Sequence, residues 1–281
     1  MPWVVTGALE NVPGLVVYSS HMFVEDTLDG GASAWLPRVH NGTPIKRWRQ
    51  LRGKSEELPP DWPPQRAVTD TQRSAKASPA ATSIYCNCKG VQFTLRSAVD
   101  LESVPEKELP WYIEPQTLKY RAKPDVCDSC RITSGVDMVE WAYAPLSHIE
   151  FNSKTAQGPS EFPASLAALR DAVSSDSRDP RLGTLAMYQS SPGVERYFCA
   201  ECSANVFYSV HDRDGIVDIA VGLLDHPDGA RAEGLLAWSY GQIAYEEDAR
   251  EGWREGLVSA AKAYGKERLT SVKEDMISQK T

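Results

Sequence analysis

The stretch Tyr197-Phe198-Cys199-Ala200-Glu201-Cys202-Ser203-Ala204-Asn205-Val206-Phe207 sets a Cys-x-x-Cys turn between an aromatic approach and an aromatic exit. All six cysteines of the chain fall into short pairs of this kind: Cys86 with Cys88, Cys127 with Cys130, and Cys199 with Cys202. Structural zinc takes four ligands in a tetrahedron, and one Cys-x-x-Cys turn supplies two of them. Six thiols therefore predict one complete four-thiolate zinc site and a second site that the cysteines alone leave unfinished.

Two other interpretations of the cysteine pairs are weaker. A disulfide within Cys-x-Cys or Cys-x-x-Cys closes a very small ring, whereas useful structural disulfides close long loops. A thioredoxin-like redox motif needs a single Cys-x-x-Cys at a strand-to-helix junction, and here three pairs spread over more than a hundred residues. Metal binding explains the pattern better.

The composition is that of an ordinary globular protein. The 281 residues, with 42% apolar content and a mean hydropathy of -0.39, suit one large domain or two small ones. A net charge of -8 and a pI near 5.3 argue against a nucleic-acid partner, because phosphate neutralisation needs a basic surface. Residues 1–5 lack the charged and apolar regions of a signal peptide, and no apolar run reaches membrane-spanning length. We therefore expect a cytoplasmic protein without a membrane partner.

The chain divides by its pattern into four segments. Residues 1–57 begin with two apolar runs, at 4–11 and 15–18, that predict strand, turn and strand. Residues 58–81 are rich in Pro, Ser and Ala, which is typical of a linker. Residues 82–248 carry the cysteine pairs and most of the predicted strands. Residues 249–281 predict a helical tail, because apolar side chains recur at helical spacing at Trp253, Leu257, Ala260 and Tyr264.

Alternation predicts the local structure of the segment 82–248. Cys86 and Cys88 are two residues apart, so on a strand both side chains point to one face and can bind one ion. Val91, Phe93 and Leu95 alternate with polar residues, which predicts a half-buried strand. Further strands are expected at 136–143 and 216–224, and a short amphipathic helix at 165–173. The expected fold class is mainly β with a few short helices.

Three motifs carry a resemblance to a known family: Cys-x-Cys-x-x-Val-x-Phe at 86–93, Cys-x-x-Cys-Arg-x-x-x-Gly at 127–135, and Phe-Cys-x-x-Cys at 198–202. Over residues 83–248 the chain resembles the glutathione-dependent formaldehyde-activating enzyme family, which includes centromere protein V. The resemblance implies a small Mss4-like zinc-binding β fold whose structural zinc is held by Cys86, Cys88, Cys199 and Cys202. It also implies a second zinc, held by a Cys-x-Cys-x-x-Cys run, where a thiol such as glutathione binds.

The chain departs from the family pattern at two positions. Asp125 stands where the first cysteine of the second run is expected, so the second site would join a carboxylate to the thiolates of Cys127 and Cys130. Such a zinc would be more Lewis acidic. The alternative is that Asp125 is a surface turn residue before a site that no longer holds metal. Ser203 replaces the glycine that follows the last cysteine pair in the family, and a left-handed backbone there would be mildly strained.

The opening segment also resembles a fragment of the same family. Gly7, Leu9, Glu10, Gly14 and Phe23 align at a constant offset of 215 with Gly222, Leu224, Asp225, Gly229 and Trp238. Residues 1–57 would then be an N-terminal β fragment resembling the back half of a second copy of the domain. Such a fragment cannot bury its apolar face alone, so we expect it to pack on residues 82–248 or on another copy of the chain in a homodimer.

The resemblance implies a zinc-dependent carbon-sulfur lyase or thiol-adduct enzyme that acts on glutathione, a related thiol or thioether, or a carbonyl metabolite. A bound zinc lowers the pKa of a thiol or polarises a carbonyl. Arg131 or Ser134 is expected to orient a substrate anion, and His211 is the histidine best placed by sequence to transfer a proton. The simpler interpretation of His211 is an ordinary polar residue at a strand end. Two alternatives stay open: a zinc-stabilised binding module without catalysis, and a zinc Lewis-acid enzyme that uses no glutathione.

Overall fold

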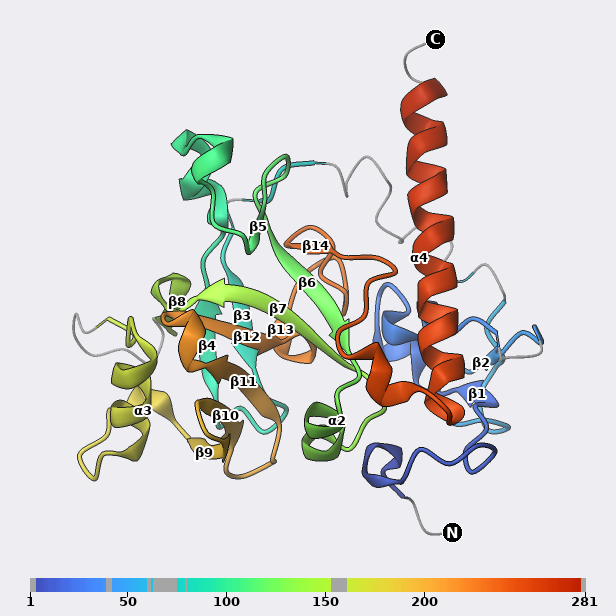
Figure 1. Ribbon diagram of the computed structural model, residues 1–281, viewed down its shortest axis with the longest axis horizontal. Helices are drawn as coiled ribbons and strands as arrows, with labels where there is room; N and C mark the ends of the chain where they lie inside the picture. Colours follow the sequence, from blue (N-terminus) through green and yellow to red (C-terminus); the bar gives the residue numbers. More distant parts are fainter. Residues whose placement is uncertain are drawn as a thin grey trace.

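The computed structural model describes residues 4–38, 42–59, 62, 75–78, 80–152 and 161–278, with side chains of the last helix described through residue 267. The molecule is mainly β with few helices, as expected, and its sheets are open (Figure 1). Short 3-10 helices connect the strands, at Thr6–Ala8, Val24–Asp26, Gly31–Ala34, Ala98–Ser103, Glu106–Glu108, Leu146–His148, Pro180–Leu182, His211–Arg213, Val221–Leu223 and Glu246–Ala249.

The larger sheet has eight strands. Seven follow the order β14 (Leu236–Trp238), β6 (Lys119–Asp125), β7 (Val139–Pro145), β12 (Ile216–Ala220), β11 (Asn205–Val210), β10 (Val194–Cys199) and β9 (Leu185–Ser191). The short β5 (Ile113–Glu114) also pairs with β6. Every pair is antiparallel except β14 with β6. Neighbouring strands in sequence mostly pair with each other, so the cysteine turn between β10 and β11 lies within a hairpin.

The second sheet is antiparallel, with strand order β13 (Leu224–Asp225), β3 (Thr82–Tyr85), β4 (Gln92–Leu95) and β8 (Ile149–Phe151). Its apolar side chains share one core with those of the larger sheet. Phe93 of β4 stacks on Phe207 of β11, with ring centroids 6.0 Å apart. Phe93 and Leu95 are fully buried between half-buried neighbours, which confirms the alternation predicted for this strand. Two cysteine-bearing turns, one from each sheet, are thereby brought to the same place.

Three α-helices accompany the sheets among the residues that the structure describes. Helix α2 (Asp128–Ser134) follows β6, and α3 (Leu166–Ser174) begins at Ser165, whose side chain accepts a hydrogen bond from the Ala168 amide. Both the short amphipathic helix and the C-terminal helix, α4 (Trp253–Ser278), are confirmed. In the part of the chain that the structure describes, no helix combines the length and the apolar character needed to cross a membrane.

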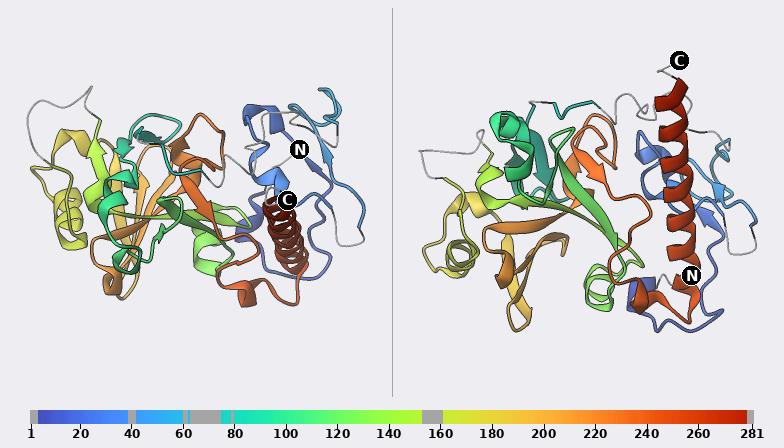
Figure 2. Two further views of the ribbon diagram at one scale, coloured as in Figure 1. Left: turned by 90° about the horizontal axis from the view of Figure 1, so that it is seen from above. Right: turned by 45° about the horizontal axis from the view of Figure 1, so that its top comes forward.

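The N-terminal segment lies beside α4 at one end of the molecule, and α3 lies at the other end (Figures 1 and 2). Trp35 is 3% exposed and contacts Tyr264 of α4 and Trp238 of β14, at centroid distances of 5.3 and 5.2 Å. Leu36 forms a small cluster with Leu257 of α4. Apolar side chains of the segment are thus buried against α4 and the larger sheet.

Several local predictions are wrong. The runs 4–11 and 15–18 form no strands, and the described N-terminal residues form only the short parallel pair β1 (Ser20–His21) and β2 (Lys46–Arg47) and two isolated β-bridges, Arg38 with Pro44 and Trp48 with Glu57. In the first run Gly7 packs closely on the backbone after α2, where an added Cβ would come within 2.4 Å of the Arg131 carbonyl, and its amide donates to the Gly135 carbonyl at 3.3 Å instead of to a neighbouring strand. The run 216–224 is broken after Ala220, and its two halves belong to different sheets.

Most of the predicted linker falls on residues 60, 61, 63–74 and 79, which lie outside the described residues. Ala77, within the described remainder, is buried, and its amide donates to the Thr117 carbonyl at 2.7 Å.

Candidate metal centres

Four cysteine sulfurs converge where the two sheets meet. Cys86 and Cys88 come from the turn between β3 and β4, Cys199 is the last residue of β10, and Cys202 lies in the turn that leads to β11. All four Sγ atoms lie within 4.8 Å of one another. Strand β3 ends at Tyr85, so the predicted strand geometry for the first pair is wrong and a turn brings its sulfurs together. Four thiols from two distant turns form the first metal cluster.

The spacing of these sulfurs fits a tetrahedral metal. Cys88 Sγ lies 3.4 Å from Cys86 Sγ and 3.5 Å from Cys199 Sγ. Zinc–sulfur bonds of about 2.3 Å would place tetrahedral sulfurs about 3.8 Å apart. A disulfide would need a separation of about 2.05 Å, and the cysteines are free. The donor set therefore fits a closed four-thiolate zinc site.

The two turns are built alike. Lys89 and Ser203 each follow a cysteine pair in the left-handed conformation, with φ of 62° and 60°, and each amide donates to the carbonyl of its first cysteine at 2.9 Å. The strain expected at Ser203 is thus confirmed. Backbone amides of Gly90 and Val91 donate to the Cys88 and Cys86 sulfurs, both at 3.4 Å. Such donors stabilise thiolates, the form in which cysteine binds a metal.

Cys199 has a further donor. The hydroxyl of Thr184 lies 3.0 Å from its sulfur. Burial opposes ionisation of Cys199, but the Thr184 hydroxyl and the amides of Glu201 and Cys202 together lower the pKa of this thiol to about 6.

The second cluster lies at the junction of β6 and α2. Asp125 ends the strand, Cys127 is the N-cap of the helix and Cys130 follows in the first turn, with ligand atoms within 4.8 Å of one another. The Asp125 carboxylate accepts the Cys127 amide at 2.8 Å, and the Cys127 sulfur accepts the Cys130 amide at 3.2 Å. Asp125 is 8% exposed, so it is no surface turn residue.

Charged and buried groups surround this second cluster. Burial raises the pKa of Asp125. The neighbouring Cys127 thiol lowers the pKa of Cys130, and the Arg196 guanidinium, whose nitrogens lie 3.6 and 3.7 Å from the Cys130 sulfur, acts in the same direction. Arg196 is 3% exposed and also covers the Tyr208 ring, at 4.9 Å from its centroid. A buried cation therefore favours a thiolate at Cys130.

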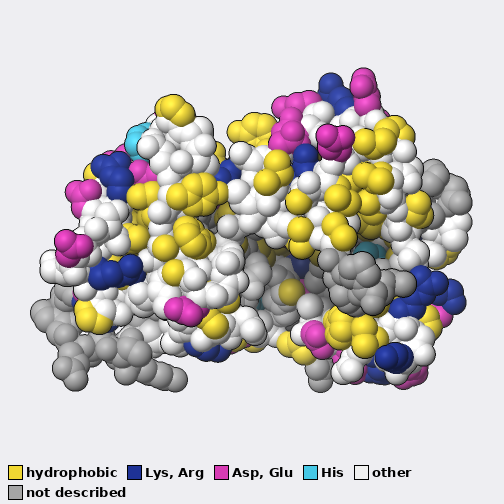
Figure 3. All heavy atoms as spheres, turned by 90° about the horizontal axis from the view of Figure 1, so that it is seen from below, with side chains coloured by type: hydrophobic (Ala, Val, Ile, Leu, Met, Phe, Trp, Pro, Cys, Tyr) yellow, Lys and Arg dark blue, Asp and Glu magenta, His cyan; other side chains and the backbone are white. Residues whose placement is uncertain are grey.

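These three ligand residues line one wall of a cavity of about 790 Å³. The underside of the molecule, where α2 and β9 to β11 come forward, is hollowed near its middle (Figure 3). The volume is large enough for a small metabolite. The remaining lining residues are Lys123, Asp128, Ser129, Tyr143, Ser190, Ser191, Val194, Arg196, Tyr208, Val210, Asp212, Arg213, Asp218, Ala244, Tyr245, Glu247 and Asp248. Three protein ligands beside an open cavity match the usual pattern of a catalytic zinc, unlike the closed first cluster.

The three side chains expected to act on substrate lie elsewhere. Arg131 donates to the backbone carbonyls of Gly7 and Leu9, the second at 3.2 Å, and it is buried under the N-terminal segment. Ser134 donates to the Cys130 carbonyl at 2.7 Å. His211 contacts the buried Glu195 carboxylate at 3.0 Å. None of the three is among the residues that line this cavity, so the substrate roles expected for them stay predictions.

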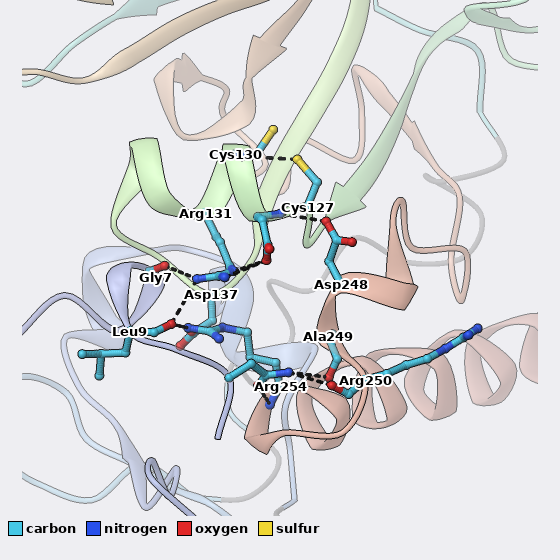
Figure 4. Close-up of polar contacts among 12 residues, drawn as sticks. Gly7, Leu9, Cys127, Cys130, Arg131, Asp137, Asp248, Ala249, Arg250 and Arg254 are labelled. Atoms are coloured by element: carbon cyan, nitrogen blue, oxygen red, sulfur yellow. Dashed lines mark hydrogen bonds and ion pairs between the residues drawn. The ribbon is translucent and has the colours of Figure 1, made fainter. Parts of the chain in front are cut away.

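Helix α2 is held from two sides (Figure 4). Arg131 reaches the N-terminal segment, where Arg254 of α4 donates to the Thr6 and Leu9 carbonyls at 2.7 and 2.9 Å. On the other side, the Asp128 amide donates to the Asp248 carboxylate at 2.9 Å. The element that carries Cys127 and Cys130 is therefore fixed by segments far away in the sequence.

Sequence reasoning missed Arg196 and the cavity tyrosines. Arg196 is on the strand that leads into Cys199, and alternation places it on the face opposite the buried Tyr197. The alternation predicts on which face of the strand Arg196 lies, but it does not predict the contact with Cys130, which is 66 residues away in the sequence.

No protein-family model matches the chain, and no curated protein matches it significantly.

Proposed function

We propose that the chain is a zinc-dependent enzyme that forms or breaks a carbon–sulfur bond in a thiol adduct. In this proposal the fold is Mss4-like, Cys86, Cys88, Cys199 and Cys202 hold a structural zinc, and Asp125, Cys127 and Cys130 hold a catalytic one. The observation that carries the proposal is the position of the second cluster, three ligands in the wall of a cavity of about 790 Å³.

A zinc ion bound there would lower the pKa of a substrate thiol and act as a Lewis acid toward a carbonyl. The chain's own residues would set the electrostatics around it. Asp125 adds a hard oxygen to two soft sulfurs. Arg196 partly neutralises Cys130, so the ligand set donates less electron density. Arg213, which also lines the cavity, is paired with the buried Asp218 through contacts of 2.9 and 3.2 Å, so the Asp218 carboxylate offsets its charge.

The test is metal stoichiometry in matched carboxylate variants. Wild-type protein should contain two zinc ions per chain, one for each cluster. Asp125→Ala should retain its fold by circular dichroism but lose most of the second ion. Asp212→Ala is the control, because Asp212 lines the same cavity but is outside both clusters.

Two outcomes would count against the proposal. Unchanged zinc content in folded Asp125→Ala would remove Asp125 from the ligand set. One zinc ion per wild-type chain would favour a zinc-stabilised binding module without catalysis.

A further inference from the structure

Polar contacts, and not apolar burial, hold the start of the N-terminal segment in place. Among residues 4–18, all of which the structure describes, Gly7 is the one buried residue. The side chains of Val4, Leu15 and Val17 keep exposed fractions of 64%, 55% and 68%. Apolar side chains stabilise a contact in proportion to the area they bury, so side chains this exposed contribute little. The position of this stretch therefore depends on its hydrogen bonds.

Two buried arginines bind the backbone of this stretch (Figure 4). Arg131 of α2 donates to the Gly7 carbonyl and, at 3.2 Å, to the Leu9 carbonyl. Arg254 of α4 donates to the Thr6 and Leu9 carbonyls at 2.7 and 2.9 Å. Hydrogen bonds from a charged donor are stronger than those between neutral groups. The Leu9 carbonyl thus connects α2 to α4.

Asp137, three residues beyond the end of α2, binds the same stretch through its side chain. One carboxylate oxygen accepts the Thr6 hydroxyl at 2.6 Å and the Tyr18 hydroxyl at 2.8 Å, and the other accepts the Arg254 guanidinium at 2.8 Å. Burial and this carboxylate raise the pKa of Tyr18, so its hydroxyl keeps the proton that it donates. Asp137 is buried, and a buried carboxylate needs such partners.

The same stretch also acts on the metal-binding end of α2. The Asn11 side chain binds three backbone groups at or just before the start of α4, at 3.0 to 3.1 Å. Just before α4, the Asp248 carboxylate accepts the Asp128 amide at 2.9 Å. Asp128 directly follows Cys127 in the chain. Displacing the N-terminal stretch would therefore alter contacts at both ends of the helix that carries two of the three ligands.

We propose that residues 6–18 form a latch for the second cluster: when docked on α2 and α4 they hold Cys127 and Cys130 in the geometry that a metal needs, and a bound metal stabilises the docked latch. This inference rests on the proposed function, because it takes Asp125, Cys127 and Cys130 as metal ligands. The groups that orient metal ligands strongly affect metal affinity. The coupling is reciprocal, because the factor by which docking raises metal affinity is also the factor by which the metal favours docking.

The first test is the zinc affinity of the two clusters, measured by chelator competition on the full-length protein. Thr6→Val and Tyr18→Phe each remove one hydroxyl while nearly keeping the shape of the side chain, and the double variant leaves Asp137 with Arg254 as its remaining side-chain donor. The double variant should bind the second ion about five-fold more weakly or worse, while the first ion, held by four thiolates, keeps its wild-type affinity.

Two further variants show whether the lost hydroxyl is the cause. Thr6→Ser keeps the hydroxyl and should bind both ions as wild type does. Thr27→Val is the matched control, because the Thr27 hydroxyl donates at 2.8 Å to the Val24 carbonyl and not to Asp137. Circular dichroism of each variant shows that its fold is retained. If the double variant does not fold, the two single variants decide the same question.

The second test measures the reciprocal effect on the backbone of the latch. Cys127→Ser removes a ligand of the second ion, so it should speed hydrogen exchange of the Gly7 amide, which donates to the Gly135 carbonyl at 3.3 Å, by about five-fold or more. The Val24 amide, which donates to the Trp48 carbonyl at 3.2 Å within the same N-terminal segment, should exchange as in wild type.

The outcomes separate this inference from the proposed function. If wild type binds two zinc ions and the double variant binds both as tightly, or loses affinity at both clusters alike, the latch does not act on the second cluster. The inference is then overturned, and the proposed function stands. Unchanged exchange of the Gly7 amide in Cys127→Ser would overturn the reciprocal coupling. One zinc ion per wild-type chain would refute the second metal site and this inference with it.

Discussion

Replacing Cys199 by serine should unfold the protein, because the first cluster ties the two sheets together. Cys199 is fully buried, and its partner Cys88 is 111 residues away in sequence. A serine hydroxyl is a poor zinc ligand, so in Cys199→Ser only three thiolates remain to bind the ion. The ion is then bound weakly or lost, and the three thiolates repel one another.

The magnitude follows from the topology of the cluster. A cross-link that closes a loop of about 100 residues contributes about 4.7 kcal/mol through chain entropy alone, and structural zinc sites contribute about 10–16 kcal/mol in small peptides. The net stability of a whole domain is only about 5–15 kcal/mol. Losing the four-thiolate site should therefore remove most or all of the stability.

Cys127→Ser is the matched comparison. Cys127 belongs to the local junction of β6 and α2, so its metal joins no distant segments. A serine is also a good helix N-cap, and its oxygen can accept the Cys130 amide that the sulfur now accepts. We expect this variant to remain folded, with one zinc ion fewer and without thiol-adduct activity.

The assay is circular dichroism melting paired with zinc analysis on both variants. Cys199→Ser should be insoluble or lack a cooperative transition, while Cys127→Ser should melt close to wild type. A folded Cys199→Ser protein, or a collapsed Cys127→Ser protein, would show that the structural and catalytic roles are assigned the wrong way round.

Three further changes test other parts of the structure. Gly7→Ala should destabilise the protein by about 1–3 kcal/mol, because the added Cβ would meet backbone atoms of α2 and the residues after it at 2.4 to 2.5 Å; Gly222→Ala, with open space around it, is the thermal-melt control. Burial raises the pKa of Glu140 to about 7, so the folded state binds more protons between pH 4.5 and 7 and this group's contribution to stability falls as pH rises through that window. Glu140→Gln should therefore match wild type near pH 5 and exceed it near pH 8, by at most about 3 kcal/mol, and equal melting curves at pH 8 would contradict this. Deleting residues 1–57 should lower the melting temperature or cause aggregation, since Trp35 leaves a buried aromatic cluster; unchanged melting and solubility would refute it.

The sequence alone was sufficient for features set by local chemistry. The spacing of the cysteine pairs predicted one four-thiolate cluster and one unfinished cluster, because ligands two or three residues apart converge in almost any turn. Which two pairs share the first cluster was implied by the family resemblance and not by the spacing. Alternation predicted β4, and helical spacing predicted α4, since a single buried face dictates each pattern. The left-handed turn at Ser203 was implied by the family resemblance, in which a glycine follows the last cysteine pair.

Only the tertiary structure decided what surrounds each cluster. Arg131 follows Cys130 directly, yet the helix turns its side chain toward Gly7, while Arg196, 66 residues away, lies against the Cys130 sulfur. The apolar runs at the start of the N-terminal segment predict strands, but in the structure they form no strands and this segment packs closely on α2 and α4. Sequence spacing fixes which residues share a turn or a face. The two sheets, α2 and α4 bury their apolar surfaces against one another, and this packing decides which faces distant in sequence come into contact. It is therefore a property of the whole fold.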